Sequence, residues 1–347
     1  MRARLLTTLL LLLLALPAVA GPKESKTKPE PTVPPLLLSG GRRLTYERSI
    51  SSERETRLKQ GFWSRVLDTV AGPPTMHTML RPYSVVTDSK GRVIVTDPGQ
   101  SGVHVFDLAR QKYRFISRDA DKDPLVSPQC VAVDADDNIY VTDSETGKVF
   151  VFSPEGKFRR AIGSLKGGEG FFKRPTGIAV DSAAQRIYVT DTLRHQIFVL
   201  DMQGSVLQTI GKRGMDQGEL NFPTELRLTP EGLVVVDAMN FRVQAFDRSG
   251  AFLWSVGNVG ESTGRMFRPK GVGLDSEHNL YVVDGIFETV QVFDKNGRLL
   301  FYFGQSGDGP AEFQLPAGLF IDRDDRIYVV DSYNHRVEVF HLSGPAK

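Results

Sequence analysis

The chain has 347 residues, of which 40% are hydrophobic and 24% charged, and its formal net charge is +2 at pH 7. This apolar content excludes a wholly disordered chain, and the near-neutral charge disfavours nucleic acid, which proteins bind mainly by neutralising phosphates. The single cysteine, Cys130, excludes an internal disulfide, and its apolar surroundings favour a small buried side chain over a nucleophile.

The first twenty residues have the pattern of an export signal. Arg2 and Arg4 precede an apolar run over 5–16, and Ala18-Val19-Ala20 is a small-x-small cleavage site. The alternative is a retained membrane anchor, but the run is short for a span of about 20 residues. We therefore expect residues 1–20 to be cleaved, which leaves a neutral periplasmic or extracellular protein without a transmembrane segment.

Residues 21–40 are predicted to be a disordered linker. Residues 21–35 read GPKESKTKPEPTVPP, which is rich in Pro, Lys and Glu and lacks aromatic residues. Such a segment has too little apolar surface to order itself, so we expect a flexible, partly extended tether.

Residues 41–80 contain a strand-like piece, Arg43–Ile50 (RLTYERSI), followed by a long connection with GFWSRVLDTVAG at 61–72. The apolar residues of this second piece recur at the spacing of one helix face, which predicts a short helix. These residues are Phe62, Trp63, Val66, Leu67 and Val70. The helix is expected either to pack on the domain as a structural plug or to serve as a lid or docking element.

Residues 81–347 repeat one unit six times. The units open with RPYSVVTD, SPQCVAVD, RPTGIAVD, FPTELRLT, RPKGVGLD and LPAGLFID, and their prolines are spaced by 46, 47, 48, 46 and 47 residues. Each unit continues with a second apolar strand that ends in aspartate, a third strand such as VHVFD or VQVFD, and a looser fourth strand. The six repeat aspartates are Asp97, Asp143, Asp191, Asp237, Asp284 and Asp331.

Four short strands repeated at a fixed period predict an all-β, six-bladed β-propeller of four-stranded antiparallel blades. A linear solenoid is the alternative, but it would need capping repeats with polar outer faces. The sixth unit ends after its third strand, and the length and pattern of Arg43–Ile50 match the fourth strands elsewhere. We therefore expect this piece to complete blade six and close the ring, which removes an exposed sheet edge.

The repeats resemble those of NHL-repeat proteins, here as an exported bacterial type. The resemblance rests on DAMNFRVQAFD from Asp237, DSYNHRVEVF from Asp331, and Gly-rich connections such as GKRGMDQGELNFP. Blades one, two and five depart from the Asn-x-Arg pattern, with PGQSGV, SETGKV and GIFETV. The resemblance implies a propeller that serves as an interaction module for proteins or RNA, although some relatives are enzymes.

Strands alternate in direction within a blade, so the loops between second and third strands share one face with the connections between blades. This loop face is more basic than the whole chain, and its cations are candidates to bind carboxylates or an anionic polymer. The alternative interpretation is structural: the loop asparagines set turns, and the arginines pair with the repeat aspartates. For the aspartates we favour this structural role, and for the arginines both interpretations stay open. The residues concerned are Arg194, His195, Asn240, Arg242, Asn334, His335 and Arg336, with Lys173, Arg174, Lys212, Arg213, Arg268 and Lys270, and Trp63 beside them.

A metal-dependent lyase or hydrolase is the alternative function. The chain also resembles, in fold, the zinc lyase that completes peptide α-amidation, which implies histidines directly after the strand-opening prolines. None of the six positions after the opening prolines holds a histidine. His195 and His335 are expected on opposite sides of the axis. The residues after the prolines are Tyr83, Gln129, Thr176, Thr224, Lys270 and Ala317.

Two acidic clusters, at Asp134 (DADDN) and Asp322 (DRDDR), lack the full calcium-loop pattern. We therefore expect no catalytic residue, no metal and no cofactor, with zinc or calcium as the open alternatives. The expected function is a monomeric binding module of the cell envelope, for a protein partner or an anionic polymer.

Overall fold

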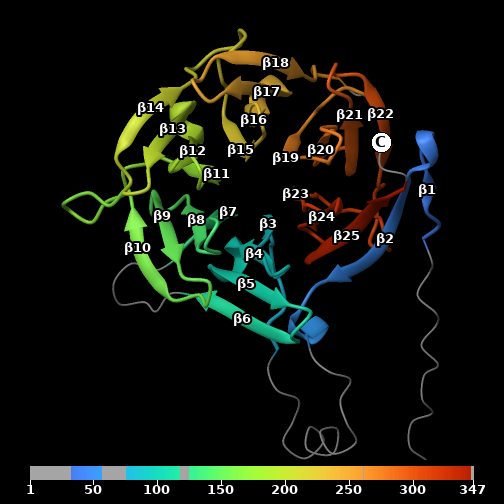
Figure 1. The fold of residues 1–347 in the computed structure, drawn as a ribbon, viewed down its shortest axis with the longest axis horizontal. Helices are drawn as coiled ribbons and strands as arrows, with labels where there is room; N and C mark the ends of the chain where they lie inside the picture. The colour runs from blue at the N-terminus through green and yellow to red at the C-terminus, as the bar shows by residue number, and fades with distance from the viewer. Residues whose placement is uncertain (1–32, 57–75, 118–124, 261, 345–347) are drawn as a thin grey trace, which may run out of the picture. The chain divides into compact units, whose positions relative to one another are not determined.

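Six antiparallel sheets follow one another around a common axis, one for each sequence repeat (Figure 1). The computed structural model describes residues 33–56, 76–117, 125–260 and 262–344. In each sheet the first strand of the repeat lies innermost and the later strands follow outward. The predicted six-bladed β-propeller is therefore confirmed.

The first three blades each have four strands. Blade one comprises β3 (Ser84–Thr87), β4 (Val93–Asp97), β5 (Gly102–Asp107) and β6 (Lys112–Ser117). Blade two comprises β7 (Pro128–Val133), β8 (Ile139–Asp143), β9 (Lys148–Phe152) and β10 (Phe158–Ile162). Blade three comprises β11 (Pro175–Asp181), β12 (Arg186–Asp191), β13 (Gln196–Asp201) and β14 (Val206–Ile210).

The next two blades repeat this arrangement, and blade six differs. Blade four comprises β15 (Pro223–Leu228), β16 (Gly232–Asp237), β17 (Arg242–Asp247) and β18 (Phe252–Val256). Blade five comprises β19 (Pro269–Leu274), β20 (Leu280–Asp284), β21 (Thr289–Phe293) and β22 (Leu299–Phe303). Blade six comprises β23 (Leu319–Ile321), β24 (Arg326–Asp331), β25 (Arg336–Ser343), β2 (Arg43–Ile50) and β1 (Leu36–Leu37). Short 3-10 turns are η1 (Ser39–Gly41), η2 (Glu53–Thr56), η3 (Pro98–Gln100), η4 (Thr192–Arg194) and η5 (Ala238–Asn240).

Strand β2 closes the ring with the bounds predicted for it. It pairs antiparallel with β25 over its whole length, from Arg43 opposite Ser343 to Ile50 opposite Val337. Strand β1 adds a short fifth strand outside β2, as Figure 1 shows. Strand β1 pairs only with Arg43 and Leu44, so it covers the first two residues of the outer edge of β2.

Neighbouring blades share their apolar cores. One buried cluster joins Ile94 and Val105 of blade one to Val131 and Phe150 of blade two. The second strands of blades one, two, four and five are buried at every residue, whereas outer strands such as β18 alternate between exposed and covered residues. Each blade therefore depends on the next to bury its faces, and its inner strands are accordingly apolar on both sides.

Threonine hydroxyls add hydrogen bonds between the first four blades. In each case the threonine directly before the repeat aspartate donates to a backbone carbonyl of the next blade. The acceptor belongs to the residue that follows the opening proline of that blade. These pairs are Thr96 with Gln129, Thr142 with Thr176, and Thr190 with Thr224. Blades four to six carry valine at this position instead, namely Val236, Val283 and Val330.

Two expectations concern segments that are only partly described. The predicted helix at 61–72, with Trp63, lies outside the described residues, as does most of the linker at 21–40. The described part of that linker, residues 33–40, contains β1 and most of η1. In the described ranges no helix is long and apolar enough to cross a membrane.

Candidate functional site

Each repeat aspartate fixes the segment that leads into the inner strand of its blade. Asp97 accepts hydrogen bonds from the backbone N–H groups of Leu80 (2.7 Å) and Arg81 (2.9 Å), just before the inner strand of its own blade. The same bond recurs in every blade, and all six carboxylates are fully buried. The donors in the other blades are the N–H groups of Val126, Lys173, Asn221, Phe267 and Gln314.

The Asn and Arg side chains of the Asn-x-Arg pattern form hydrogen bonds with the repeat aspartate and with the connection that precedes their own blade. Arg242 Nε donates to Asp237 at 2.9 Å, and its NH2 group donates to the carbonyls of Asp216 (2.8 Å) and Glu219 (3.0 Å). Asn240 Nδ2 also donates to Asp237, at 2.8 Å. These side chains clamp the connection between blades, and Nε and Nη2 of Arg242 and Nδ2 of Asn240 are occupied within the protein.

Blade six has the same clamp. Arg336 donates to Asp331 at 2.8 Å and to the carbonyl of Glu312 at 2.8 Å, while Asn334 donates to Asp331 at 2.7 Å. The Arg336 side chain is 13% exposed. The sequence left two roles open for these arginines, binding a partner or pairing with the repeat aspartates, and the structure shows the pairing, with Asp237 and Asp331.

Buried polar residues of the third strands complete the clamps, and sequence reasoning did not single them out. Gln244 Nε2 donates to Asp237 at 3.0 Å and to the Glu219 carbonyl at 2.6 Å. Glu338 lies 3.1 Å from Arg336, and burial raises the pKa of its carboxyl to about 8. The available signal was a polar residue interrupting an apolar strand, as in VHVFD, VQAFD, VQVFD and VEVFH.

The loop histidines contact neighbouring connections. His195 is buried, and its Nδ1 accepts a hydrogen bond from the Phe222 N–H at 3.1 Å. Burial lowers the pKa of His195, which favours the neutral ring needed to accept that bond. His335 Nδ1 bonds the carbonyl of Leu80. The structure therefore places the two histidines in separate contacts.

Arg194 packs on aromatic rings. Its guanidinium carbon lies 4.8 Å from the ring centroid of Phe171 and 5.4 Å from that of Phe198, and its Nε lies 3.7 Å from Asp191. The cation–π contacts hold it against the blade. Arg194 is thus engaged locally, like the clamp arginines.

Three exposed arginines occupy equivalent positions at the strand entries around the axis. Arg81, Arg174 and Arg268 directly precede the opening prolines of blades one, three and five, and Ser127, Phe222 and Leu315 stand in the blades between. Their backbone N–H groups bond the repeat aspartates, which fixes their positions. Within the described ranges no side-chain hydrogen bond or ion pair engages these guanidinium groups. We call these three residues the arginine triad.

Lys270 lies beside the triad, one residue after an opening proline. Its Nζ is 6.0 Å from the ring centroid of Tyr83, although the two residues belong to blades five and one. Burial, together with the charges of Arg268 and Arg174, lowers the pKa of Lys270 to about 8. Positive charge therefore gathers at this end of the central channel.

Deeper in the channel, Glu225 and Arg227 form an ion pair. Burial raises the pKa of Glu225 to about 7, and Arg227 opposes that shift. Arg227 also donates to the carbonyl of Leu319 in blade six at 2.9 Å, which joins two non-adjacent blades. Burial raises the pKa of the Cys130 thiol, which makes it a poor nucleophile.

The acidic clusters lie at first hairpin turns, where they are bonded to the protein. Asp134 accepts from the N–H groups of Asp136 and Asn138 and from the Tyr140 hydroxyl. Asp322 accepts from equivalent groups in blade six. Nowhere in the described ranges do three His, Cys, Asp or Glu residues gather to hold a metal ion.

Comparisons with known proteins agree on the repeats and the fold. The NHL-repeat family matches residues 125–152 and 172–200, and a family described as a 6-bladed beta-propeller, DUF5128, matches residues 274–346. No curated protein matches the chain.

Solved structures with diverse descriptions share this fold. A protein of unknown function from Bacteroides thetaiotaomicron is 16% identical with a TM-score of 0.62, over 76% of this chain and 70% of that one. An auxiliary nutrient binding protein from the same organism is 14% identical with a TM-score of 0.57, over 77% and 70%. Virginiamycin B lyase from Staphylococcus aureus is 14% identical with a TM-score of 0.55, over 76% and 96%. At these identities the likeness shows the fold alone.

Proposed function

We propose that this chain, a six-bladed β-propeller that carries NHL repeats, is an exported binding module of the cell envelope. It would hold an anionic group of a protein partner or polymer at the arginine triad. The signal-like pattern of residues 1–20 supports export. A propeller suits such a role because its loops vary while the blades hold them rigidly.

The observation that carries this proposal is the unneutralised charge of the arginine triad beside Lys270. Arg81, Arg174 and Arg268 are exposed, and within the described ranges their side chains have no ion-pair partner. Burial lowers the pKa of Lys270, and repulsion from Arg268 and Arg174 adds to that lowering. A bound carboxylate or phosphate would relieve this repulsion and accept charge-assisted hydrogen bonds from the guanidinium groups.

Binding of poly-L-glutamate tests the proposal. The triple variant Arg81→Gln, Arg174→Gln and Arg268→Gln should lose most of its affinity, and wild-type affinity should fall as salt is raised. The matched control removes three exposed cations outside the loop face, through Lys112→Gln, Arg159→Gln and Arg323→Gln. Equal affinity of the two triple variants would contradict the site, whatever their difference from wild type.

The same pair of variants extends the test to a natural partner. A partner recovered from envelope extracts by the wild-type protein should be retained by the control and lost by the triad variant. Fractionation of the producing cells tests export separately, because a protein found only in the cytoplasm contradicts the envelope assignment.

A further inference from the structure

A groove lies between blades five and six, beside the seam at which β2 pairs with β25 to close the ring. Its volume is about 990 Å³, at the upper end of the roughly 300–1,000 Å³ range of small-molecule sites. One wall is the segment Leu36–Gly40, which includes β1, and the other contains Leu300, Phe301 and Tyr302 of β22. Figure 1 shows β1 and β22 near each other at the rim of the ring.

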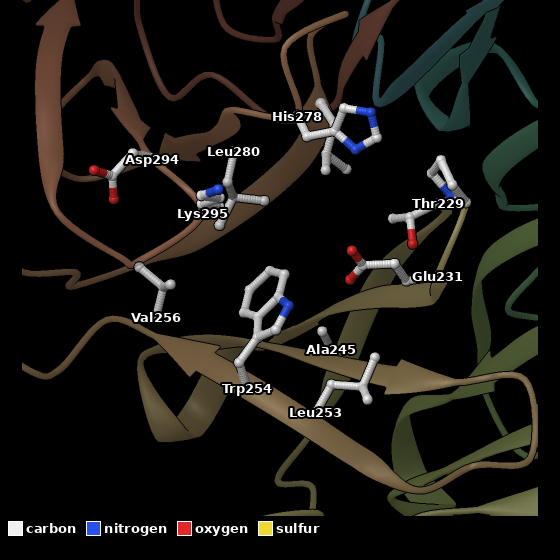
Figure 2. Close-up of a pocket in the computed structure, with 12 residues that line it drawn as sticks. Thr229, Glu231, Ala245, Leu253, Trp254, Val256, His278, Leu280, Asp294 and Lys295 are labelled. Atoms are coloured by element: carbon white, nitrogen blue, oxygen red, sulfur yellow. The ribbon is translucent and has the colours of Figure 1, made fainter.

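The gap between blades four and five shows that such a groove is not a general feature of the ring. There the indole of Trp254 points from β18 toward Leu280 of blade five (Figure 2), and it packs on the buried cluster that the two blades share. The cavity left in that gap is about 50 Å³, which is too small for most organic ligands. The much larger space at the seam therefore needs a local cause.

The chain topology supplies that cause. In blades two and three an outer-strand side chain, Arg160 or Gln208, donates to a carbonyl in the third hairpin turn of the next blade. Blade six has no such turn, because its strands β25 and β2 come from opposite ends of the described chain. The segment Leu36–Gly40, which leads into β2, lies at this place instead and forms one wall of the groove.

The two walls expose apolar side chains toward the groove. Leu36 and Leu37 are 40% and 76% exposed on one wall, and Leu300 and Tyr302 are 42% and 53% exposed on the other. Phe301 lies between the walls and the core, where it packs on the buried cluster shared by blades five and six. An apolar ligand in the groove would remove this exposed surface from water, which is favourable. The walls therefore suit an aliphatic chain.

Arg298 is the most exposed charged side chain of the groove in the described structure. It lies in the third turn of blade five, is 77% exposed, and has its Nε 3.2 Å from Asp294. The other charged side chains are more enclosed: Asp294 and Arg42 are each 15% exposed, and Glu277 is 31% exposed and lies 2.6 Å from Arg42. Asp275 is 1% exposed. The terminal nitrogens of Arg298 are therefore placed to donate to an anion that enters the groove.

We propose that this groove binds a fatty acid, an aliphatic chain that ends in a carboxylate. The chain would lie between Leu37 and Leu300, and the carboxylate would accept charge-assisted hydrogen bonds from Arg298. The hydroxyl of Tyr302, for which no hydrogen bond occurs within the described ranges, offers a further donor. The groove shares no residue with the arginine triad, so this proposal does not rest on the proposed function.

Isothermal titration calorimetry with octanoate, decanoate and dodecanoate tests the proposal on the wild-type protein. Each added methylene removes more apolar surface from water, so each step of two methylenes should tighten binding by about tenfold. Raising the salt concentration should weaken binding of all three, because the carboxylate is held by an exposed cation.

Two variants with matched controls locate the chain and the head group. Leu300→Gln should weaken dodecanoate binding about tenfold, whereas Leu207→Gln, at the equivalent outer-strand position of blade three, should leave it unchanged. Leu207 is 49% exposed, so both substitutions spare the core and should keep the wild-type melting temperature. Arg298→Gln should also weaken binding about tenfold, and Lys157→Gln, at the equivalent turn position of blade two, should not.

Three outcomes would overturn the proposal. The first is that dodecanoate does not bind, or binds no more tightly than octanoate. The second is an equal loss of affinity in a groove variant and its matched control. The third is binding to phosphatidylglycerol vesicles without binding of free dodecanoate, because the exposed leucines would then mark a membrane contact. Poly-L-glutamate binding should be the same in all four variants, so failure here is distinguishable from failure of the triad.

Discussion

Ile50 of β2 lies directly opposite Val337 of β25, and both side chains are fully buried in one cluster with Val85 of blade one. This pair joins the first long strand of the described chain to its last. The ring is therefore closed by packing and hydrogen bonds between strands far apart in sequence.

Ile50→Ala is expected to lower the free energy of unfolding by about 2–5 kcal/mol, because it leaves a cavity in this cluster. Urea denaturation measures the change. Leu37→Ala in β1 is the matched control, since Leu37 is 76% exposed, and it should change stability by less than about 0.5 kcal/mol. Equal effects of the two variants would show that β2 does not close the ring in solution.

Arg336→Ala should destabilise the protein by about 3–5 kcal/mol, because it leaves the buried carboxylates of Asp331 and Glu338 without their cation. Arg213→Ala is the control: Arg213 is exposed, and within the described ranges it makes no ion pair. Thermal unfolding at fixed pH gives both values. A variant at Arg336 that melts like the control would mean that the clamp is loose and the guanidinium is free for a partner.

Glu225 should make stability depend on pH. Burial raises its folded-state pKa to about 7, above its unfolded value of about 4.3, so the folded state binds more protons between these values. The stability contributed by this group is full below pH ~4.3 and is lost as pH rises toward 7. Glu225→Gln should remove this component from a series of urea titrations. The exposed Glu169→Gln should leave the pH profile unchanged, and a similar flattening in both variants would contradict the assignment.

Lys270 should impose a pH limit on anion binding. Its pKa of about 8 means that the side chain loses its charge as pH rises through 8, so affinity for poly-L-glutamate should fall there. Lys270→Arg keeps a charged group to higher pH and should retain affinity above pH 8. Binding measured from pH 6 to 9.5 checks this, and identical profiles for the two proteins would remove Lys270 from the site.

Much of the architecture was predictable because the same pattern of strands and turns occurs six times in the sequence. Six copies of one pattern average out local ambiguity, and the missing fourth strand of the sixth unit pointed to Arg43–Ile50. The site was less predictable. Arg242 and Arg268 are both basic residues of the loop face, but Arg242 donates to Asp237 and the Arg268 side chain has no ion pair in the described ranges. A pattern of residue types does not show which arginine has a carboxylate within reach.

The sequence by itself determined the number of blades, the closing strand and the face that carries the loops, because strand period and chain direction follow from local patterns. Only the tertiary structure decided which charges are neutralised and which side chains of neighbouring blades pack together. Trp254 illustrates this difference: it is one aromatic residue in an ordinary outer strand, and only the structure shows that it packs on the buried cluster shared by blades four and five. Such contacts depend on residues from neighbouring repeats meeting in space, which no single repeat encodes.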